Sequence, residues 1–164
     1  MKMQLMFTMI LSTIFLTNCA KDNDAPNAEV SMNDYVVNYG TSFGMCVGPC
    51  RKEMEFSNNE LIFTVYYTEG RGAIGGVPQI YKEPLTNTLV SNITQNINFD
   101  TFKKLDEVIG CPDCADGGKE WVEIIKGDVK HKVTFENGNS PKEIENLVKI
   151  LREKRVYFEE KYIK

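Results

Sequence analysis

Hydrophobic and polar residues alternate in several segments of the chain, and alternation at a period of two predicts half-buried β-strands. The clearest pair is 52–57 and 61–67, which a polar Ser-Asn-Asn-Glu turn joins into an expected hairpin. A second hairpin is expected where a Lys-Gly-Asp turn separates two further segments of this kind. The expected strands are 35–40, 52–57, 61–67, one or two within 80–97, 120–125 and 129–136.

Two segments repeat their apolar residues at the helical period. The first, 99–110, is expected to end at Gly110, because glycine readily terminates a helix. The second, 140–155, starts with Ser140 as the expected N-cap, and Glu143 completes a capping box. Its apolar residues fall on one helix face: Ile144, Leu147, Val148 and Leu151.

These elements together predict one α+β domain, with an antiparallel sheet of about five to seven strands and about two helices packed on one face. Residues 156–163 fit either a last strand or a continuation of the second helix. The glycine-rich segment 68–78 is interpreted as a long hairpin loop. Its glycine pairs also suggest a phosphate cradle, but the Gly-Lys-Ser/Thr ending of a P-loop does not follow them.

The N-terminal segment has the pattern of an exported protein. Residues 3–17 are mainly apolar and follow Lys2. This run is too short to cross a bilayer, which takes about 20 residues, so it predicts a secretory signal peptide. The tetrapeptide Leu-Thr-Asn-Cys at 16–19 resembles the lipobox of bacterial lipoproteins, although Asn18 departs from the small residue usual there. The resemblance implies that Cys19 becomes the first mature residue and carries more than one acyl chain, as stable anchoring requires.

On this resemblance the chain divides into a lipoprotein signal peptide (1–18), a lipidated cysteine with a flexible tether (19–33) and a single domain (34–164). The Lys-Asp-Asn-Asp stretch at 21–24 is similar to the acidic tether that sends some Gram-negative lipoproteins to the cell surface. We therefore expect a protein of the cell envelope, attached through palmitate or a related lipid on Cys19. The outer membrane is the expected location, with the domain facing the periplasm or the cell surface.

The net charge of the chain limits the kinds of partner that we expect. The chain has a net charge of −4 and contains no basic run, so it lacks the electrostatic footprint of a nucleic-acid-binding protein. The expected partners are the membrane, through the lipid on Cys19, and a protein or small molecule whose chemistry the sequence does not specify.

Four further cysteines lie within the expected domain, as the close pairs Cys46/Cys50 and Cys111/Cys114. Export places them in an oxidising compartment, so we expect two disulfides, either local or crossed between the two pairs. A four-cysteine zinc site is one alternative, because both spacings suit tetrahedral zinc. A thiol-redox pair is the other, although Cys111 and Cys114 follow an expected helix, whereas a reactive thiol of this type starts one.

The segment around the first pair, Gly44-x-Cys46-x-Gly48-x-Cys50, resembles a turn found in domains of unknown function in small secreted or lipid-anchored bacterial proteins. The resemblance covers about residues 35–150. It implies a compact α+β domain and no known activity.

Three weaker site candidates remain. His131, the single histidine, shares a strand face with apolar residues, which is typical of a packing residue. Trp121, the single tryptophan, fits either a ligand platform or a residue of the core or its margin. Asp113, Asp116 and Glu120 suggest calcium, but their spacing fails the EF-hand pattern, and a tight turn before the next strand is the preferred interpretation.

The sequence shows no recognisable catalytic set, such as a G-x-S-x-G elbow. We therefore expect a non-enzymatic binding or structural module that uses no cofactor. An envelope thiol-redox or metal-binding factor that uses the two cysteine pairs is one alternative, with zinc as the metal. An inhibitor or immunity-type module is another, by analogy with other small envelope domains.

Overall fold

The computed structural model describes Met32, residues 34–71 and residues 73–163. The expected signal peptide and the lipidation of Cys19 lie outside the described residues. Within the part of the chain that is described, no helix has the length and apolar character needed to span a membrane.

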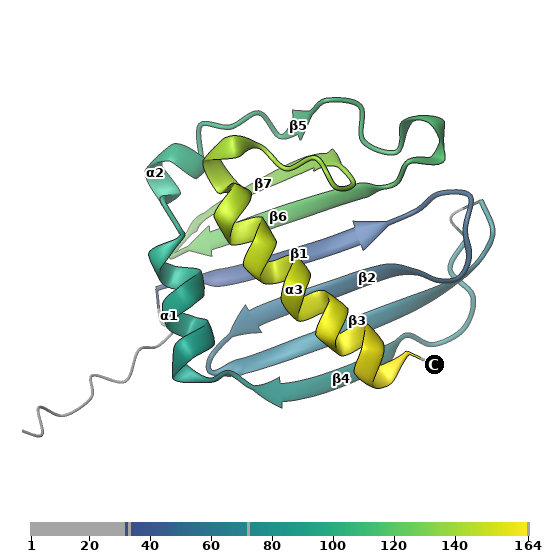
Figure 1. Ribbon diagram of the computed structural model, residues 1–164, viewed down its shortest axis with the longest axis horizontal. Coiled ribbons are helices and arrows are strands. Elements are labelled where there is room, and N and C mark those ends of the chain that lie inside the picture. Colours follow the sequence, from purple (N-terminus) through teal and green to yellow (C-terminus); the bar gives the residue numbers. More distant parts are fainter. Residues whose placement is uncertain (1–31, 33, 72, 164) are drawn as a thin grey trace, which may run out of the picture.

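The described residues form one seven-stranded sheet in the order β4-β3-β2-β1-β6-β7-β5 (Figure 1). Each pair of neighbouring strands is antiparallel except β5 and β7, which are parallel. The expected α+β fold is confirmed, and both predicted hairpins are present as β2–β3 and β6–β7. The strands are β1 (Val36–Ser42), β2 (Val47–Ser57), β3 (Glu60–Glu69), β4 (Gln79–Pro84), β5 (Val108–Ile109), β6 (Lys119–Lys126) and β7 (Val129–Glu136).

The helices cover one face of the sheet, and the longest of them, α3, crosses that face diagonally (Figure 1). The helical segments are α1 (Asn87–Gln95), α2 (Phe99–Phe102), the 3₁₀ turns η1 (Cys114–Asp116) and η2 (Lys142–Ile144), and α3 (Glu145–Tyr162). We call the helix-bearing side the covered face and the other side the open face.

The hydrophobic core lies between the covered face and the helices. Alternation along the strands sends Val37 and Tyr39 of β1, and Val122 and Ile124 of β6, into this core, where all four are fully buried. Burial of one large apolar side chain stabilises the fold by about 1.5–3 kcal/mol, so this shared layer dominates stability. The helices contribute Val90, Ile93, Phe99, Phe102, Leu147, Val148, Leu151 and Phe158.

Residues 87–97, which we expected within strands, form α1 instead. Thr86 caps the helix by accepting a hydrogen bond from the backbone N–H of Leu89 at 3.3 Å. Val90 and Ile93 are three residues apart and both buried, which is the spacing of one helix face. The β-branched residues of the segment suggested strands, but the threonine cap and this spacing prevail.

The expected helix over 99–110 is also wrong beyond its first turn. Helix α2 ends at Phe102, and Val108 and Ile109 form β5 beside β7. The backbone N–H of Thr134 donates to the carbonyl of Glu107 at 2.8 Å, which draws the segment onto the sheet edge. Pairing with an existing strand therefore outweighs the helical periodicity.

The second expected helix is confirmed, with a different start. The 3₁₀ turn η2 precedes α3, and neither Pro141 before η2 nor Ile144 before α3 makes a side-chain capping bond. Pro141 is extended, with ψ 142°, so the helix cannot begin at Ser140 as the capping-box pattern suggested. Residues 156–162 continue the helix, which settles the ambiguity at the C-terminal end.

A buried ion pair fastens α3 to the covered face. Arg152 donates from Nη2 to Oε2 of Glu120 at 2.7 Å and from Nε to Oε1 at 3.3 Å. The Glu120 side chain is only 1% exposed, and Arg152 is the cation that its carboxylate meets beneath α3. Tyr39 lies in the same region, and its burial raises the pKa of the phenol to about 12.

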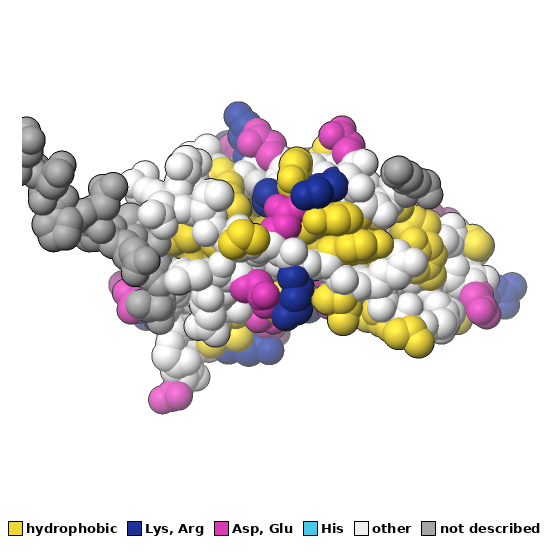
Figure 2. All heavy atoms as spheres, turned by 90° about the horizontal axis from the view of Figure 1, so that it is seen from below, with side chains coloured by type: hydrophobic (Ala, Val, Ile, Leu, Met, Phe, Trp, Pro, Cys, Tyr) yellow, Lys and Arg dark blue, Asp and Glu magenta, His cyan; other side chains and the backbone are white. Residues whose placement is uncertain are grey.

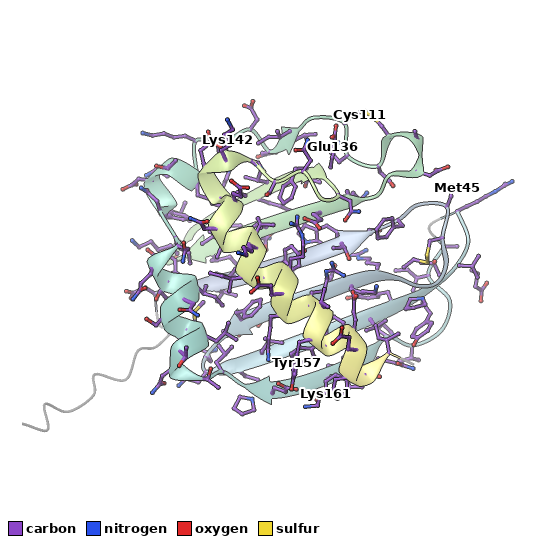
Figure 3. All side chains as sticks on the ribbon, in the orientation of Figure 1. Met45, Cys111, Glu136, Lys142, Tyr157 and Lys161 are labelled. Atoms are coloured by element: carbon purple, nitrogen blue, oxygen red, sulfur yellow. A yellow bond between two sulfur atoms is a disulfide. The ribbon has the colours of Figure 1, made fainter. Side chains whose placement is uncertain are left out.

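Strand β4 forms one edge of the sheet, and Figure 2 views the molecule from that side, where apolar side chains lie beside acidic and basic ones. Glu83 of β4 accepts hydrogen bonds from Lys161 at 2.8 Å and Tyr162 at 3.0 Å, and lies 3.4 Å from the Lys154 ammonium. Partial burial raises the pKa of Glu83, but these partners outweigh it and lower the pKa overall. The network ties the last turns of α3, which carry Tyr157 and Lys161 (Figure 3), to the edge strand.

Candidate functional site

The open face carries polar and charged side chains and two adjoining pockets. The first, of about 440 Å³, lies at the end of the sheet where three loops meet, and we call it the loop pocket. The second, of about 350 Å³, lies over the middle of the strands, and we call it the strand pocket. Both volumes are in the range of small-molecule sites. The loop pocket is lined by Ser42, Phe43, Gly44, Arg51, Thr68, Ile74, Asp113, Lys119, Trp121, Lys132 and Thr134.

Trp121 lines both pockets, and its indole lies against Gly40 of the neighbouring strand. Its register partner on β1 is Gly40, the residue that makes room for the indole. A Cβ atom at Gly40 would lie 2.7 Å from Cη2 of Trp121 and closer still to Cζ2. Trp121 is 7% exposed and lies at the margin of the core, which is one of the positions expected from sequence, and on the open face it lines both pockets.

Cationic groups flank this indole. The Lys132 ammonium lies 4.9 Å from the Trp121 ring centroid, and the Arg51 guanidinium lies 5.8 Å from it. The same guanidinium lies 4.9 Å from the Tyr66 ring, and its Nε donates to Glu53 at 2.9 Å. Cation–π contacts of this length hold the long basic side chains over the aromatic surface.

The two cysteine pairs close two of the loops that border the loop pocket. Cys46 and Cys50 form a disulfide with 5.7 Å between their Cα atoms, and Cys111 and Cys114 form another with 5.5 Å. The expected disulfides are confirmed, and the pairing is local. A zinc site or a dithiol would need these sulfurs reduced. Within the described residues, no group of three or more His, Cys, Asp or Glu side chains is arranged to hold a metal ion.

The two disulfide loops touch each other. The backbone N–H of Gly44 donates to Oδ1 of Asp113 at 3.3 Å, and the Lys119 ammonium lies 3.9 Å from Oδ2. Asp113 has a φ of 65°, a left-handed conformation that aspartate tolerates better than most residues. Asp113 therefore links the two loops and partly balances the charge of Lys119. This residue, one of those that suggested a calcium site, has a structural role here.

The Cys111 end of the second loop is held against strand β7. The backbone N–H of Cys111 donates to Oε1 of Glu136 at 2.8 Å (Figure 3). This hydrogen bond lowers the pKa of the Glu136 carboxyl, because it favours the charged form. The loop leads into the short 3₁₀ turn η1 and then β6, so no α-helix N-terminus is present to activate a thiol at Cys111.

The glycine-rich segment supplies the third loop, and it joins β3 to β4 as the hairpin interpretation predicted. The Thr68 hydroxyl donates to the Cys46 carbonyl at 2.7 Å, which fixes this loop to the first disulfide loop. Thr68 also forms a β-bridge with Ile74, and Ile74 lines the loop pocket. All three loops are thus fastened to one another or to the sheet.

The other sequence candidates lie elsewhere. His131 faces the covered side, where its Nε2 lies 2.9 Å from the Leu105 carbonyl and its ring packs edge-on against Phe102. Glu120 lies under α3, and Asp116 is exposed in η1. His131 is therefore a packing residue, as its apolar strand face predicted.

Sequence reasoning missed most of the residues that line the pockets. Arg51, Glu53 and Glu55 alternate with the buried residues of β2, and Lys132 does so on β7. The alternation was visible, but a charged strand face on its own predicts only a solvated surface. Their relation to Trp121 depends on strand order, which the sequence did not specify. Neither a family model nor a curated protein matches this chain.

Proposed function

We propose that the protein is a non-enzymatic binding module of the cell envelope, anchored by lipid on Cys19, and that its ligand binds in the loop pocket of the open face. The observation that carries the proposal is the Trp121 floor between two cations, bordered by three loops that are fastened together. The anchoring part rests on the lipobox resemblance of residues 16–19.

Preorganisation supports a binding role. A pocket whose walls are already ordered loses little conformational entropy when a ligand enters. Here the disulfides Cys46–Cys50 and Cys111–Cys114 close two loops, and Asp113 bridges them. The indole below is fixed over Gly40. Such a site favours a ligand with an apolar part that packs against Phe43, Ile74 and the exposed edge of Trp121, and with polar groups for the cations.

The lining of the pocket favours binding over chemistry. The residues that line it include neither a histidine nor a cysteine, and the one described histidine lies on the covered face. Nucleophilic and acid–base catalysis usually place such a group next to the reacting atoms. Of the other polar groups in the lining, the Thr68 hydroxyl donates to the Cys46 carbonyl, and Asp113 accepts from the Gly44 N–H and lies 3.9 Å from the Lys119 ammonium, so both have structural partners.

The single tryptophan makes a direct test possible. The indole N–H of Trp121 gives one signal in a ¹H–¹⁵N spectrum, and a fragment library of neutral, anionic, cationic and zwitterionic compounds should shift it. We expect fragments to cluster at the loop pocket, and Ile74→Asp, which places an acid in the pocket wall, should weaken them. The proposal is wrong if no fragment shifts the indole, or if all the fragments that bind map to the covered face or the β4 edge.

The anchor is tested separately. Cys19→Ser should abolish incorporation of labelled palmitate and leave the protein uncleaved or soluble. Labelling at the wild-type level would refute lipidation at this cysteine without touching the binding proposal.

A further inference from the structure

The two pockets of the open face carry opposite charge, although the chain as a whole is mildly acidic. The charged residues of the loop pocket are Arg51, Lys119, Lys132 and Asp113. Those of the strand pocket are Glu53, Glu55, Glu123 and Lys132. Cations therefore exceed acids at one end of the open face, and acids exceed cations over its middle, with Trp121 common to both pockets.

We propose, on the basis of the function proposed above, that the ligand is zwitterionic: a short peptide-like molecule with a free ammonium and a free carboxylate. Its carboxylate binds at Lys132, which lines both pockets, and its ammonium binds at Glu55 in the strand pocket, with its backbone lying over Asn38 and Glu123. Lys132 and Glu55 carry opposite charges, so together they select such a ligand and also fix its direction, because the reversed molecule meets a like charge at each of these residues.

Lys132 is the principal group for the carboxylate. Arg51 is already engaged by Glu53, and Lys119 lies 3.9 Å from Asp113. Lys132 instead rests over the Trp121 ring at 4.9 Å, and it forms no ion pair with the carboxylates that the structure describes. A ligand carboxylate would give its ammonium an anionic partner without displacing an existing one.

Glu55 is the corresponding group for the ammonium. Glu123 already accepts a hydrogen bond from Asn38 at 2.9 Å and lies 3.0 Å from the Lys130 ammonium. Burial raises the pKa of Glu123, but these two partners outweigh it and lower the pKa overall. Glu55 accepts a hydrogen bond from the neutral Ser57 hydroxyl at 2.7 Å. Its charge is thus met by a neutral donor, which leaves it suited to a cationic partner.

The sheet sets the length of the ligand. Glu55 pairs with Asn38, Asn38 with Glu123, and Glu123 with Lys132, so these residues form one row across β2, β1, β6 and β7. Three strand spacings separate the ends of the row, which is about 14 Å between backbones. An extended tripeptide spans about 10 Å, and the two side chains cover the remainder.

Trialanine and its two capped forms test the proposal through the Trp121 indole signal. N-acetylation removes the ammonium and C-terminal amidation removes the carboxylate, while the apolar part is unchanged. Free trialanine should bind more tightly than either capped form by about 1.5-fold to fivefold, as expected for a partly exposed charge contact.

Matched variants test which residue binds each end of the ligand. Lys132→Gln should weaken free and N-acetylated trialanine and leave the amide unchanged. Glu55→Gln should weaken the free and amidated forms and leave the N-acetylated form unchanged. Lys142→Gln and Glu143→Gln make the same changes in charge on the exposed turn before α3, outside both pockets, and should change none of these affinities.

Two outcomes separate this inference from the proposed function. Equal affinity of the three peptides, or no indole shift with trialanine while other fragments shift the signal, would overturn the zwitterionic ligand and leave the binding site standing. Absence of any shift with every fragment would overturn both.

Discussion

The close approach of Gly40 to Trp121 yields the sharpest prediction about stability. In Gly40→Ala the new Cβ would lie 2.7 Å from Cη2 of the indole and closer to Cζ2, so the ring must move out of its place on β1. Overpacking of this kind costs about 1–3 kcal/mol. Alanine in place of glycine within a strand recovers about 0.5–1 kcal/mol of backbone entropy. We expect a net loss of about 1–2 kcal/mol in the free energy of unfolding.

A double-mutant cycle isolates the cause. In a Trp121→Ala background the clash is absent, so Gly40→Ala should be neutral or stabilise the protein by up to about 1 kcal/mol. Urea unfolding followed by far-UV circular dichroism measures all four proteins, including those without tryptophan. In the single Gly40→Ala variant, tryptophan emission should also shift to longer wavelength as the displaced ring meets water. If Gly40→Ala costs the same with and without the indole, Trp121 does not lie over Gly40 and the floor of the loop pocket is misassigned.

Three further predictions concern other parts of the fold. Leu147→Ala should lower the free energy of unfolding by about 2–5 kcal/mol, because Leu147 is buried against the sheet. Ser140→Ala should change it by less than about 0.5 kcal/mol, since Ser140 caps no helix. Urea unfolding midpoints measure both variants, and a larger loss for Ser140→Ala would show that Ser140 does cap the helix. Replacing both Cys111 and Cys114 with alanine should lower the free energy of unfolding by about 2 kcal/mol, which is the entropy that closing so short a loop removes from the unfolded chain. Alkylation of the wild type without reductant, followed by peptide mapping, should label neither of the two cysteines. Because the folded-state pKa of Glu83 lies below its ordinary 4.5, this carboxylate stabilises the fold fully above about pH 4.5 and loses that contribution as pH falls through the lowered value. The Glu83→Gln variant should therefore be less stable than wild type near neutral pH, and the two free energies of unfolding should converge in acid. A constant difference in stability down to pH 2 would contradict this.

The sheet was predictable where neighbouring residues determined it. The two hairpins follow from alternation on both sides of short polar turns, and these turns act over a few residues. The predictions for 87–97 and 103–110 were wrong because residues outside each segment decide its structure. A threonine cap and a buried helix face prevail in the first segment, and pairing with β7 prevails in the second. Local propensity cannot report such partners.

The candidate site was predictable only in part. The disulfides followed from the cysteine spacing and the expected compartment, and the alternation of β6 correctly separated Trp121 from Val122 and Ile124. The cations around the indole come from β2 and β7, about 80 residues apart in the chain. Their convergence depends on β1 lying between β2 and β6, an order that no local pattern encodes.

The direction of β1 gives the domain a proximal and a distal end. The strand enters the sheet at Val36 and runs for 7 residues, about 23 Å, before it reaches Ser42 in the wall of the loop pocket. Under the proposed lipidation of Cys19, the tether joins the domain on the Val36 side. The pocket then opens at the opposite end from this junction, where the attachment of the tether does not obstruct a soluble peptide. Lengthening the tether would change how far the domain extends into its compartment, but the strand itself separates the pocket from its anchor.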